Sequence, residues 1–496
     1  MSTTFRYDLY DNLAKNADKI YADVRKAATD AGVTDEMRGN LGFTGAVSGC
    51  HGLLTRAVTS AMDAGSRKVI QNSALAADVR RIVKSYYGDD YDGAMIATCE
   101  AALWVSFDVL FSPPFTGRGD NYRARYIAPY ERHMHHQAGY GRPFPPRYKD
   151  LYADRGATAG ELGFYGKRLE NLDTVIVPMV GARYPCHGIK YHPVPLLTGT
   201  DVSGTAAVLA QHAAAHVGSL VGFASLGYDT PGYGYGAKDH AGTPLLQQKI
   251  AALAHQYNVP YVTDNAWGTP FLGTDLRATG ADIMTYSMDK AAGAPTVGLI
   301  IGREDVMVPI RRALGIHGDR WGTTGSYGKA AYVTVDPGKE ALLGGLAAMR
   351  VLLEQKEVML DPLDTLHEIT LEEFKKSDLR QYGDGWLITK SVNSMAIEIN
   401  YERTWDGAGP GFPIFSIEDM YSGTNIVQNA MKAAGLVPTI GYDANIFISP
   451  GLGTSDEEGA LLEPEARAMV RALFRSLEII GKYSGIATAR KEAVRS

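Results

Sequence analysis

Tyr261-Val-Thr-Asp264-Asn-Ala-Trp267-Gly-Thr-Pro-Phe271 and, a short distance further on, Tyr286-Ser287-Met-Asp289-Lys290-Ala-Ala-Gly293 are the segments from which the fold can be predicted. In the first segment an acidic residue ends a short apolar run, and in the second a lysine follows closely after another such run. Short apolar runs bounded by turn residues are typical of buried strands. A carboxylate and a lysine amine at the ends of two neighbouring strands predict a site for chemistry on an aldehyde.

Similar apolar runs recur through the middle of the chain and alternate with helical patterns. The runs cover residues 174–180, 219–224, 259–263, 282–286 and 297–301. Residues 244–257, between two of these runs, have helical spacing. Such alternation predicts an α/β fold with a mostly parallel sheet flanked by helices on both faces. Active residues are then expected at the carboxyl ends of the strands.

The pattern divides the chain into three regions. We expect an N-terminal helical segment over residues 1–90, a large α/β domain over 91–335 and a smaller α+β domain over 336–496. Residues 112–172 interrupt the large domain and are rich in Arg, Tyr, His, Pro and Gly without long periodicity. This composition predicts an inserted loop that serves as a subunit interface or an anion-binding lid.

Composition and charge exclude several classes of function. The 496 residues include 49 basic and 55 acidic side chains, so a general affinity for nucleic acid is not expected. Cys50, Cys99 and Cys186 are widely spaced, which indicates neither a disulfide framework nor a metal site. No apolar run approaches the ~20 residues that span a bilayer. We therefore expect a cytoplasmic protein that acts on small molecules without a membrane partner or a bound metal.

Another candidate element lies earlier in the chain, where an apolar run is followed by Thr98-Cys99-Glu100 and then by a helical pattern. A helix N-terminus with exposed N–H groups and a hydroxyl suits a phosphate group. Thr98 also fits a simple helix N-cap. Likewise, taken singly, Asp264 also fits a helix cap and Lys290 a solvated surface lysine.

In this order the segments resemble the fold type I enzymes that depend on pyridoxal 5′-phosphate (PLP), the aspartate-aminotransferase-like superfamily. The resemblance extends over roughly residues 90–310 and identifies no specific member. It implies a large domain of the PLP-dependent transferase type, an enzymatic activity and PLP as the cofactor. Such enzymes commonly form their sites at a dimer interface. The resemblance therefore implies a homodimer or higher homo-oligomer with shared active sites. Residues 319–325 resemble, more loosely, a loop that crosses to the neighbouring subunit, and they also fit a turn within one subunit.

The resemblance also assigns roles to individual residues. Lys290 is the catalytic residue, which forms a Schiff base with the cofactor and then acts as general acid or base. Asp264 pairs with the pyridinium nitrogen, and the protonated ring accepts electrons from the substrate's Cα. The other cofactor-binding residues that the resemblance implies are Thr98, Cys99, Glu100 and Ser287 for the phosphate, Tyr184 or else His187 for ring stacking, and Trp267 near O3′.

Departures from the family pattern bear on the reaction type. Residues 291–301 contain no basic side chain, and residues 445–449 are largely apolar where many aminotransferases place a carboxylate-binding arginine. Arg118, Arg183 and Arg403 are candidate replacements. We therefore expect lyase-type chemistry at the α carbon of a small amino acid or amine, namely elimination, C–C cleavage or decarboxylation. The alternatives are an aminotransferase and, from the Lys290 region, a selenocysteine-synthase-like or non-catalytic RNA-binding relative.

Overall fold

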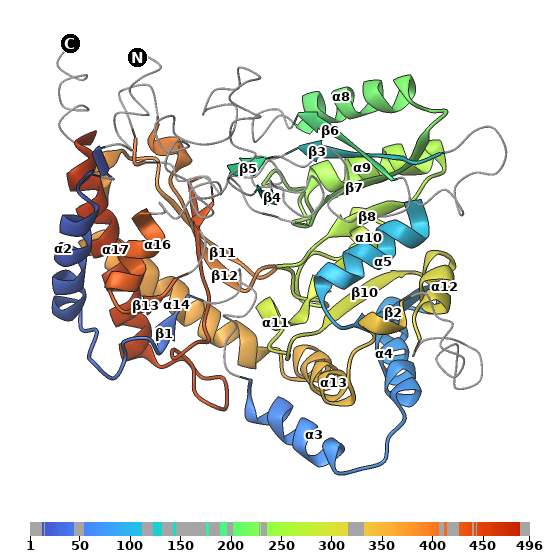
Figure 1. The fold of residues 1–496 in the computed structure, drawn as a ribbon, viewed down its shortest axis with the longest axis horizontal. Coiled ribbons are helices and arrows are strands. Elements are labelled where there is room, and N and C mark those ends of the chain that lie inside the picture. Colours follow the sequence, from blue (N-terminus) through green and yellow to red (C-terminus); the bar gives the residue numbers. More distant parts are fainter. Residues whose placement is uncertain are drawn as a thin grey trace.

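The computed structural model describes residues 12–13, 15–43, 54–111, 123–130, 142–144, 175–177, 189–195, 202–227, 229, 236–315, 332–405, 411–413, 426–438, 441–442 and 444–486. These residues form a larger and a smaller α/β unit that lie side by side (Figure 1). Within the described part of the chain, no helix has both the length and the apolar character needed to cross a membrane.

A seven-stranded sheet forms the centre of the larger unit. In spatial order its strands are β2 (Tyr91–Ile96), β10 (Gly298–Arg303), β9 (Ile283–Ser287), β8 (Tyr261–Asp264), β7 (Leu220–Leu226), β3 (Arg125–Tyr130) and β6 (Lys190–Pro195). Strand β10 is antiparallel to both of its neighbours, and the pairs from β9 to β6 are all parallel. The predicted fold class, a mostly parallel sheet flanked by helices, is confirmed.

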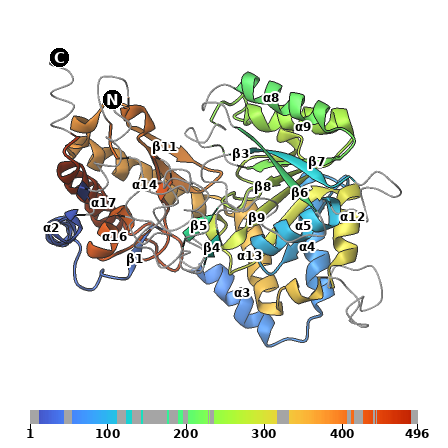
Figure 2. The same cartoon turned by 45° about the horizontal axis from the view of Figure 1, so that its top comes forward.

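Both faces of this sheet are covered. Every residue of β7, β8 and β9 is buried, and successive strand residues point to opposite faces, so neither face is open to solvent. Helix α5 (Cys99–Phe111) packs on β8, β9, β10 and β2. Other helices around the sheet are α4 (Asn72–Tyr87), α8 (Val202–Ala215), α9 (Leu245–Tyr257) and α12 (Glu304–Ala313), and α13 (Lys339–Glu354) packs on α3 (Arg56–Ser66) and α4 (Figure 2).

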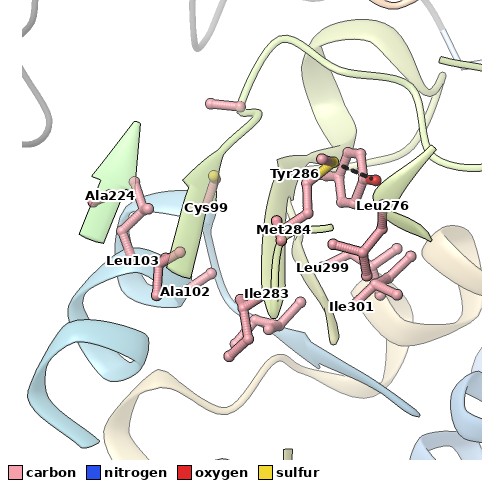
Figure 3. Close-up of a cluster of buried hydrophobic side chains, with 14 of the residues drawn as sticks. Cys99, Ala102, Leu103, Ala224, Leu276, Ile283, Met284, Tyr286, Leu299 and Ile301 are labelled. Atoms are coloured by element: carbon pink, nitrogen blue, oxygen red, sulfur yellow. Dashed lines mark hydrogen bonds between the residues drawn. The ribbon is translucent and has the colours of Figure 1, made fainter. Parts of the chain in front are cut away.

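Cross-strand pairing fixes which side chains share the core. Met284 and Tyr286 of β9 are the register partners of Ile301 and Leu299 of β10, so all four side chains lie on one face (Figure 3). The Tyr286 hydroxyl donates to Met284 Sδ at 2.9 Å on that face. The opposite face of β9 packs on α5, because Cys99 contacts Thr285.

The sequence patterns missed an interior strand of the main sheet. Strand β3 lies inside residues 112–172, for which we expected a loop, and it pairs with β7 on one side and β6 on the other. Proline and arginine within Arg125-Tyr-Ile-Ala-Pro-Tyr130 conceal the strand, since both residue types are unusual in buried strands. Conversely, the expected strand at 174–180 is the short β5 (Val175–Val177), which pairs with β4 (Arg142–Phe144) outside the main sheet.

The smaller unit combines both ends of the chain. Its four-stranded antiparallel sheet has the order β11 (Leu387–Ser391), β12 (Ala396–Asn400), β15 (Asn445–Ile448) and β14 (Gly441–Tyr442). Helices α14 (Glu357–Lys376), α16 (Ile426–Ala433) and α17 (Glu463–Ser484) belong to this unit, and the N-terminal α2 (Ala17–Asp30) packs on α16 and α17. Strand β1 (Leu41–Gly42) pairs in parallel with β13 (Leu436–Val437). One buried hydrophobic cluster therefore joins N-terminal and C-terminal residues.

A buried carboxylate links α14 to α17. Glu373 accepts hydrogen bonds from Arg471 Nε at 2.9 Å, Arg467 Nη1 at 3.0 Å and Lys376 Nζ at 2.9 Å. Burial alone would raise the pKa of Glu373, but the hydrogen bonds from these three cations outweigh it and lower the pKa to about 2. Because this value lies below that of an unfolded glutamate, Glu373 stabilises the fold fully above about pH 4.5 and loses that effect as the pH falls through about 2.

Replacement of Glu373 by Gln should therefore lower the free energy of unfolding at pH 7 by up to about 3 kcal/mol. The difference from wild type should shrink as the pH falls from 4.5 towards 2, and urea unfolding curves over this pH range measure it. Glu372→Gln is the matched control, because exposed Glu372 bonds only to Arg467 among these three cations. Equal losses in the two variants would contradict the role of Glu373.

Candidate functional site

The carboxylate at the end of β8 has one oxygen bonded and one free. Asp264 is buried, and its Oδ1 accepts a hydrogen bond from the N–H of Ala266 at 3.1 Å. Its Oδ2 is also buried and has no hydrogen-bond partner. A buried carboxylate oxygen without a donor is costly, so the site fits a ligand that presents a charged N–H group there. The ring nitrogen of PLP is such a donor.

The neighbouring strand β9 ends at Ser287 and continues directly into the short helix α11 (Met288–Ala291). The N–H of Ser287 donates to the carbonyl of Ala266 at 3.3 Å, which joins the ends of β8 and β9. Ser287 Oγ donates to Asp289 Oδ1 at 2.6 Å. This arrangement places the first turn of α11, and with it Lys290, next to the Asp264 loop.

Lys290 is half-buried, and its amine forms no hydrogen bond or ion pair with another described residue. It lines a pocket between the two units, together with residues of α14 and of the segment after β15. Met359, Ser449 and Gly459 are among the lining residues. The amine is therefore available for chemistry with a bound molecule.

The start of α5 reaches the same end of the sheet. Thr98 Oγ1 accepts a hydrogen bond from the N–H of Ala101 at 3.0 Å, so Thr98 acts as the helix N-cap. Gly298, the register partner of Ser287, lies so close that a Cβ there would be 2.4 Å from the Thr98 carbonyl oxygen. The phosphate-binding role of Thr98, Cys99 and exposed Glu100 stays a prediction, but the structure places this turn beside Ser287.

Cys99 is buried beneath the turn, and its Sγ lies 3.8 Å from Thr285 Oγ1. Burial raises the pKa of the Cys99 thiol well above its usual value, and the charge of Asp264 raises it further, while the charge of Lys290 opposes this. These influences show that the thiol, the carboxylate and the amine are close enough to interact. Cys99 is therefore a neutral wall of the site and not a nucleophile.

Trp267 stands where the two units meet. Its ring is buried and lies 4.8 Å from the ring of Phe447 in β15, at an interplanar angle of 63°. The contact brings the apolar β15, where an arginine would be typical of aminotransferases, against the loop after β8. The predicted contact of Trp267 with the cofactor oxygen is not tested by this arrangement.

Several predicted residues lie outside the described part of the chain: Tyr184, His187, Arg118, Arg183 and residues 319–325. Arg403 is described and is exposed in a short 3₁₀ helix, η7 (Glu402–Thr404). Among the described residues no group of three or more His, Cys, Asp or Glu side chains is arranged to hold a metal ion. The described site is thus formed by the ends of β8 and β9 and the start of α5.

The sequence patterns did not single out two buried amides at this site, Asn265 and Asn393. Asn265 directly follows Asp264, and Asn393 lies in the turn between β11 and β12 of the smaller unit. Their side chains are hydrogen-bonded to each other although the residues are 128 positions apart. Asparagine is common in turns, so neither residue carries a sequence signal of this contact.

Comparison with known proteins finds similarity in the segment that contains β8 and β9. Residues 237–320 match the family model of the class-V aminotransferases. A selenium transferase for L-seryl-tRNA(Sec) from Desulfovibrio desulfuricans is 36% identical over 84 residues, which cover 15% of this chain and 17% of that protein. A 5′-C-glycyluridine monooxygenase-decarboxylase from Streptomyces sp. is 33% identical over 174 residues, 33% of this chain and 38% of that protein.

These matches span well under half of the curated relatives' own length. A solved structure of pyridoxamine-pyruvate aminotransferase from Mesorhizobium loti aligns over 93% of this chain and 99% of its own, with 14% identity and a TM-score of 0.49. The family match includes Asp264, Trp267, Ser287 and Lys290. It confirms the predicted resemblance to fold type I enzymes and PLP as their cofactor.

The close approach of β10 to the α5 turn leads to a prediction. Gly298→Ala places a methyl group 2.7 Å from the Cys99 nitrogen and 2.4 Å from the Thr98 oxygen, and backbone atoms cannot easily move away. We expect the free energy of unfolding to fall by about 1–3 kcal/mol and PLP to bind more weakly, as measured by urea unfolding and cofactor titration. Gly218→Ala, where a methyl group meets open space, is the control. Unchanged cofactor binding in Gly298→Ala would contradict a ligand at this turn.

Proposed function

We propose that this chain is a PLP-dependent enzyme of fold type I in which Lys290 carries the cofactor and Asp264 pairs with its ring nitrogen. The observation that supports the proposal most strongly is the buried Asp264 Oδ2 without a donor, within the segment that matches the class-V aminotransferases. A structural carboxylate of the fold would have its oxygens satisfied by the protein. Asp264 is satisfied only on the side that faces its own turn.

Each residue then has a distinct task. PLP, when bound, supplies a ring that withdraws electrons from the substrate's α carbon. Asp264 would keep the ring nitrogen protonated, and Thr98, the first N–H groups of α5 and Ser287 would hold the phosphate. The amine of Lys290 would hold the cofactor and would add or remove a proton at the substrate's α carbon. In this structure Asp289 accepts the single hydroxyl hydrogen of Ser287, so Ser287 would donate to the phosphate only after its hydroxyl turns away from Asp289.

For the reaction we propose lyase-type chemistry at the α carbon of a small amino acid or amine, with transamination as the alternative. Two features favour lyase-type chemistry over transamination. Residues 291–301 lack a basic side chain, and Phe447 packs on Trp267 at a position where aminotransferases commonly have an arginine. The relative from Streptomyces is named as a decarboxylase, and decarboxylation is one of the lyase-type reactions proposed here. The acidic balance of the chain argues against the RNA substrate named for the selenium transferase.

We also propose a cytoplasmic location and a homodimer or larger assembly with shared sites. The cysteine usage supports the location. The resemblance of residues 319–325 to a loop that crosses to a neighbouring subunit supports the assembly. Sedimentation of the purified chain with PLP distinguishes a homo-oligomer from a monomer.

The role of Lys290 has a direct test. Borohydride treatment of the PLP-loaded protein should fix the cofactor covalently to the tryptic peptide that contains Lys290, and Lys290→Ala should abolish both this labelling and the visible absorption band of wild type. Lys249→Ala, which removes an exposed lysine of α9, is the control and should be labelled normally. Labelling elsewhere in wild type, or no labelling at all, would defeat the proposal.

The reaction type requires a second measurement. Single-turnover mixing of the PLP-loaded protein with a panel of small amino acids and amines should give product while the cofactor returns to its starting spectrum. Release of a keto acid or aldehyde in an amount equal to the enzyme, with full conversion to the pyridoxamine form, would instead establish the aminotransferase alternative. Spectra and product masses from the same sample distinguish the two.

A further inference from the structure

We infer that Asn393 is a positioning residue, which holds the loop that carries Asp264 and Trp267 in place from the smaller unit. The inference rests on the proposed function, because it concerns the residues that would face PLP. Its evidence is a set of buried hydrogen bonds between the turn after β11 and the segments after β7 and β8.

The two amides form a reciprocal pair. Asn265 Nδ2 donates to Asn393 Oδ1 at 3.1 Å, and Asn393 Nδ2 donates to Asn265 Oδ1 at 3.1 Å. Both side chains are buried, with 0% and 4% exposure. A buried amide that loses its partner pays the full desolvation cost of the unpaired groups. The pair therefore couples the position of Asn265 to that of Asn393 strongly.

Asn393 forms further bonds with the same region. Its carbonyl oxygen accepts from the N–H of Thr269 at 2.7 Å and from Thr269 Oγ1 at 3.0 Å, and its Oδ1 also accepts from the N–H of Thr274 at 3.0 Å. Its Nδ2 also donates to the carbonyl of Gly227 at 3.3 Å. Asn393 thus fixes both ends of the loop that contains Trp267 and the segment that follows β7.

Three glycines leave the space that the amide pair occupies. A Cβ at Gly227 would lie 2.4 Å from Asn265 Cβ, and a Cβ at Gly268 would lie 2.1 Å from Asn265 Nδ2. A Cβ at Gly273 would lie 2.5 Å from Asn393 Oδ1. Tight enclosure on these sides means that the amides cannot shift to new partners without moving the backbone.

The connection to Asp264 is short. Asn265 is its chain neighbour, and the carbonyl of Asp264 accepts from the N–H of Gly227 at 2.6 Å. The N–H of Ala266, one residue beyond Asn265, holds Asp264 Oδ1. A rotation of the Asn265 peptide therefore redirects Oδ2, the atom that would face the ring nitrogen. Ser391, at the end of β11, bonds instead to Asp229 and accepts from the N–H of Ser394 in its own turn, and neither bond is made with the loop after β8.

A double-mutant cycle on the PLP-loaded chain tests this role. Asn393→Ala and Asn265→Ala should each weaken PLP binding about 10- to 100-fold and shift the pH dependence of the bound cofactor's absorption. The double variant should lose less than the sum of the two single-variant losses, because the two side chains share one pair of hydrogen bonds. Ser391→Ala, the control from the same turn, should bind PLP and titrate like wild type.

Other outcomes decide against the inference. Variants that are merely less stable, yet bind PLP and titrate as wild type does, would make Asn393 a structural residue only. Should Asn393→Ala fail to fold, Asn393→Asp keeps the shape, removes the donor and is expected to show the same changes. In the cofactor-free protein, hydrogen exchange at the backbone N–H groups of Thr269 and Thr274 should be faster in the variants than in wild type. This expectation does not depend on PLP, so a failure of the positioning role of Asn393 can be distinguished from a failure of the proposed function.

Discussion

The parallel register between β8 and β9 determines where the chemistry of this protein can take place. It sets Asp264 opposite Thr285, so β9 extends two residues further before it turns into α11. Lys290 therefore emerges one helical turn beyond the level of the carboxylate. A slip of one residue would send every side chain of β9 to the other face of the sheet. Cys99 would then lose its contact with Thr285, and Met284 would leave the opposite core.

The buried carboxylate that this register positions differs from other buried carboxylates in its hydrogen bonds. The fold keeps the Asp264 carboxylate out of water but supplies a donor to only one of its oxygens. Two other buried carboxylates are paired with cations, Glu373 with three of them and Asp92 with Arg80 and Arg311. The contrast separates a carboxylate that stabilises the protein from one whose second oxygen is left for a ligand.

The sequence predicts the elements whose signals are local. The apolar runs of β8, β9 and β10 and the helix α9 are recognisable because their burial on both faces requires continuous apolar residues. Strand β3 is not predicted from the sequence, because Arg125 and Pro129 interrupt its apolar pattern and its place in the sheet depends on residues distant in the chain. The pairing of β1 with β13, in which Leu41 is the partner of Leu436, is not predicted for the same reason.

The same distinction applies within the site. Asp264, Ser287 and Lys290 all lie within residues 237–320, the segment that matches the class-V aminotransferase family model. Thr98, Asn393 and Phe447 lie outside it and reach the site only through tertiary contacts. In the proposed function this segment supplies the groups that hold the cofactor, and such groups are shared by enzymes with different reactions. Part of the pocket wall around Lys290 comes from the smaller unit, and so under the proposed function the residues that select the substrate should be sought in α14 and in the segment after β15.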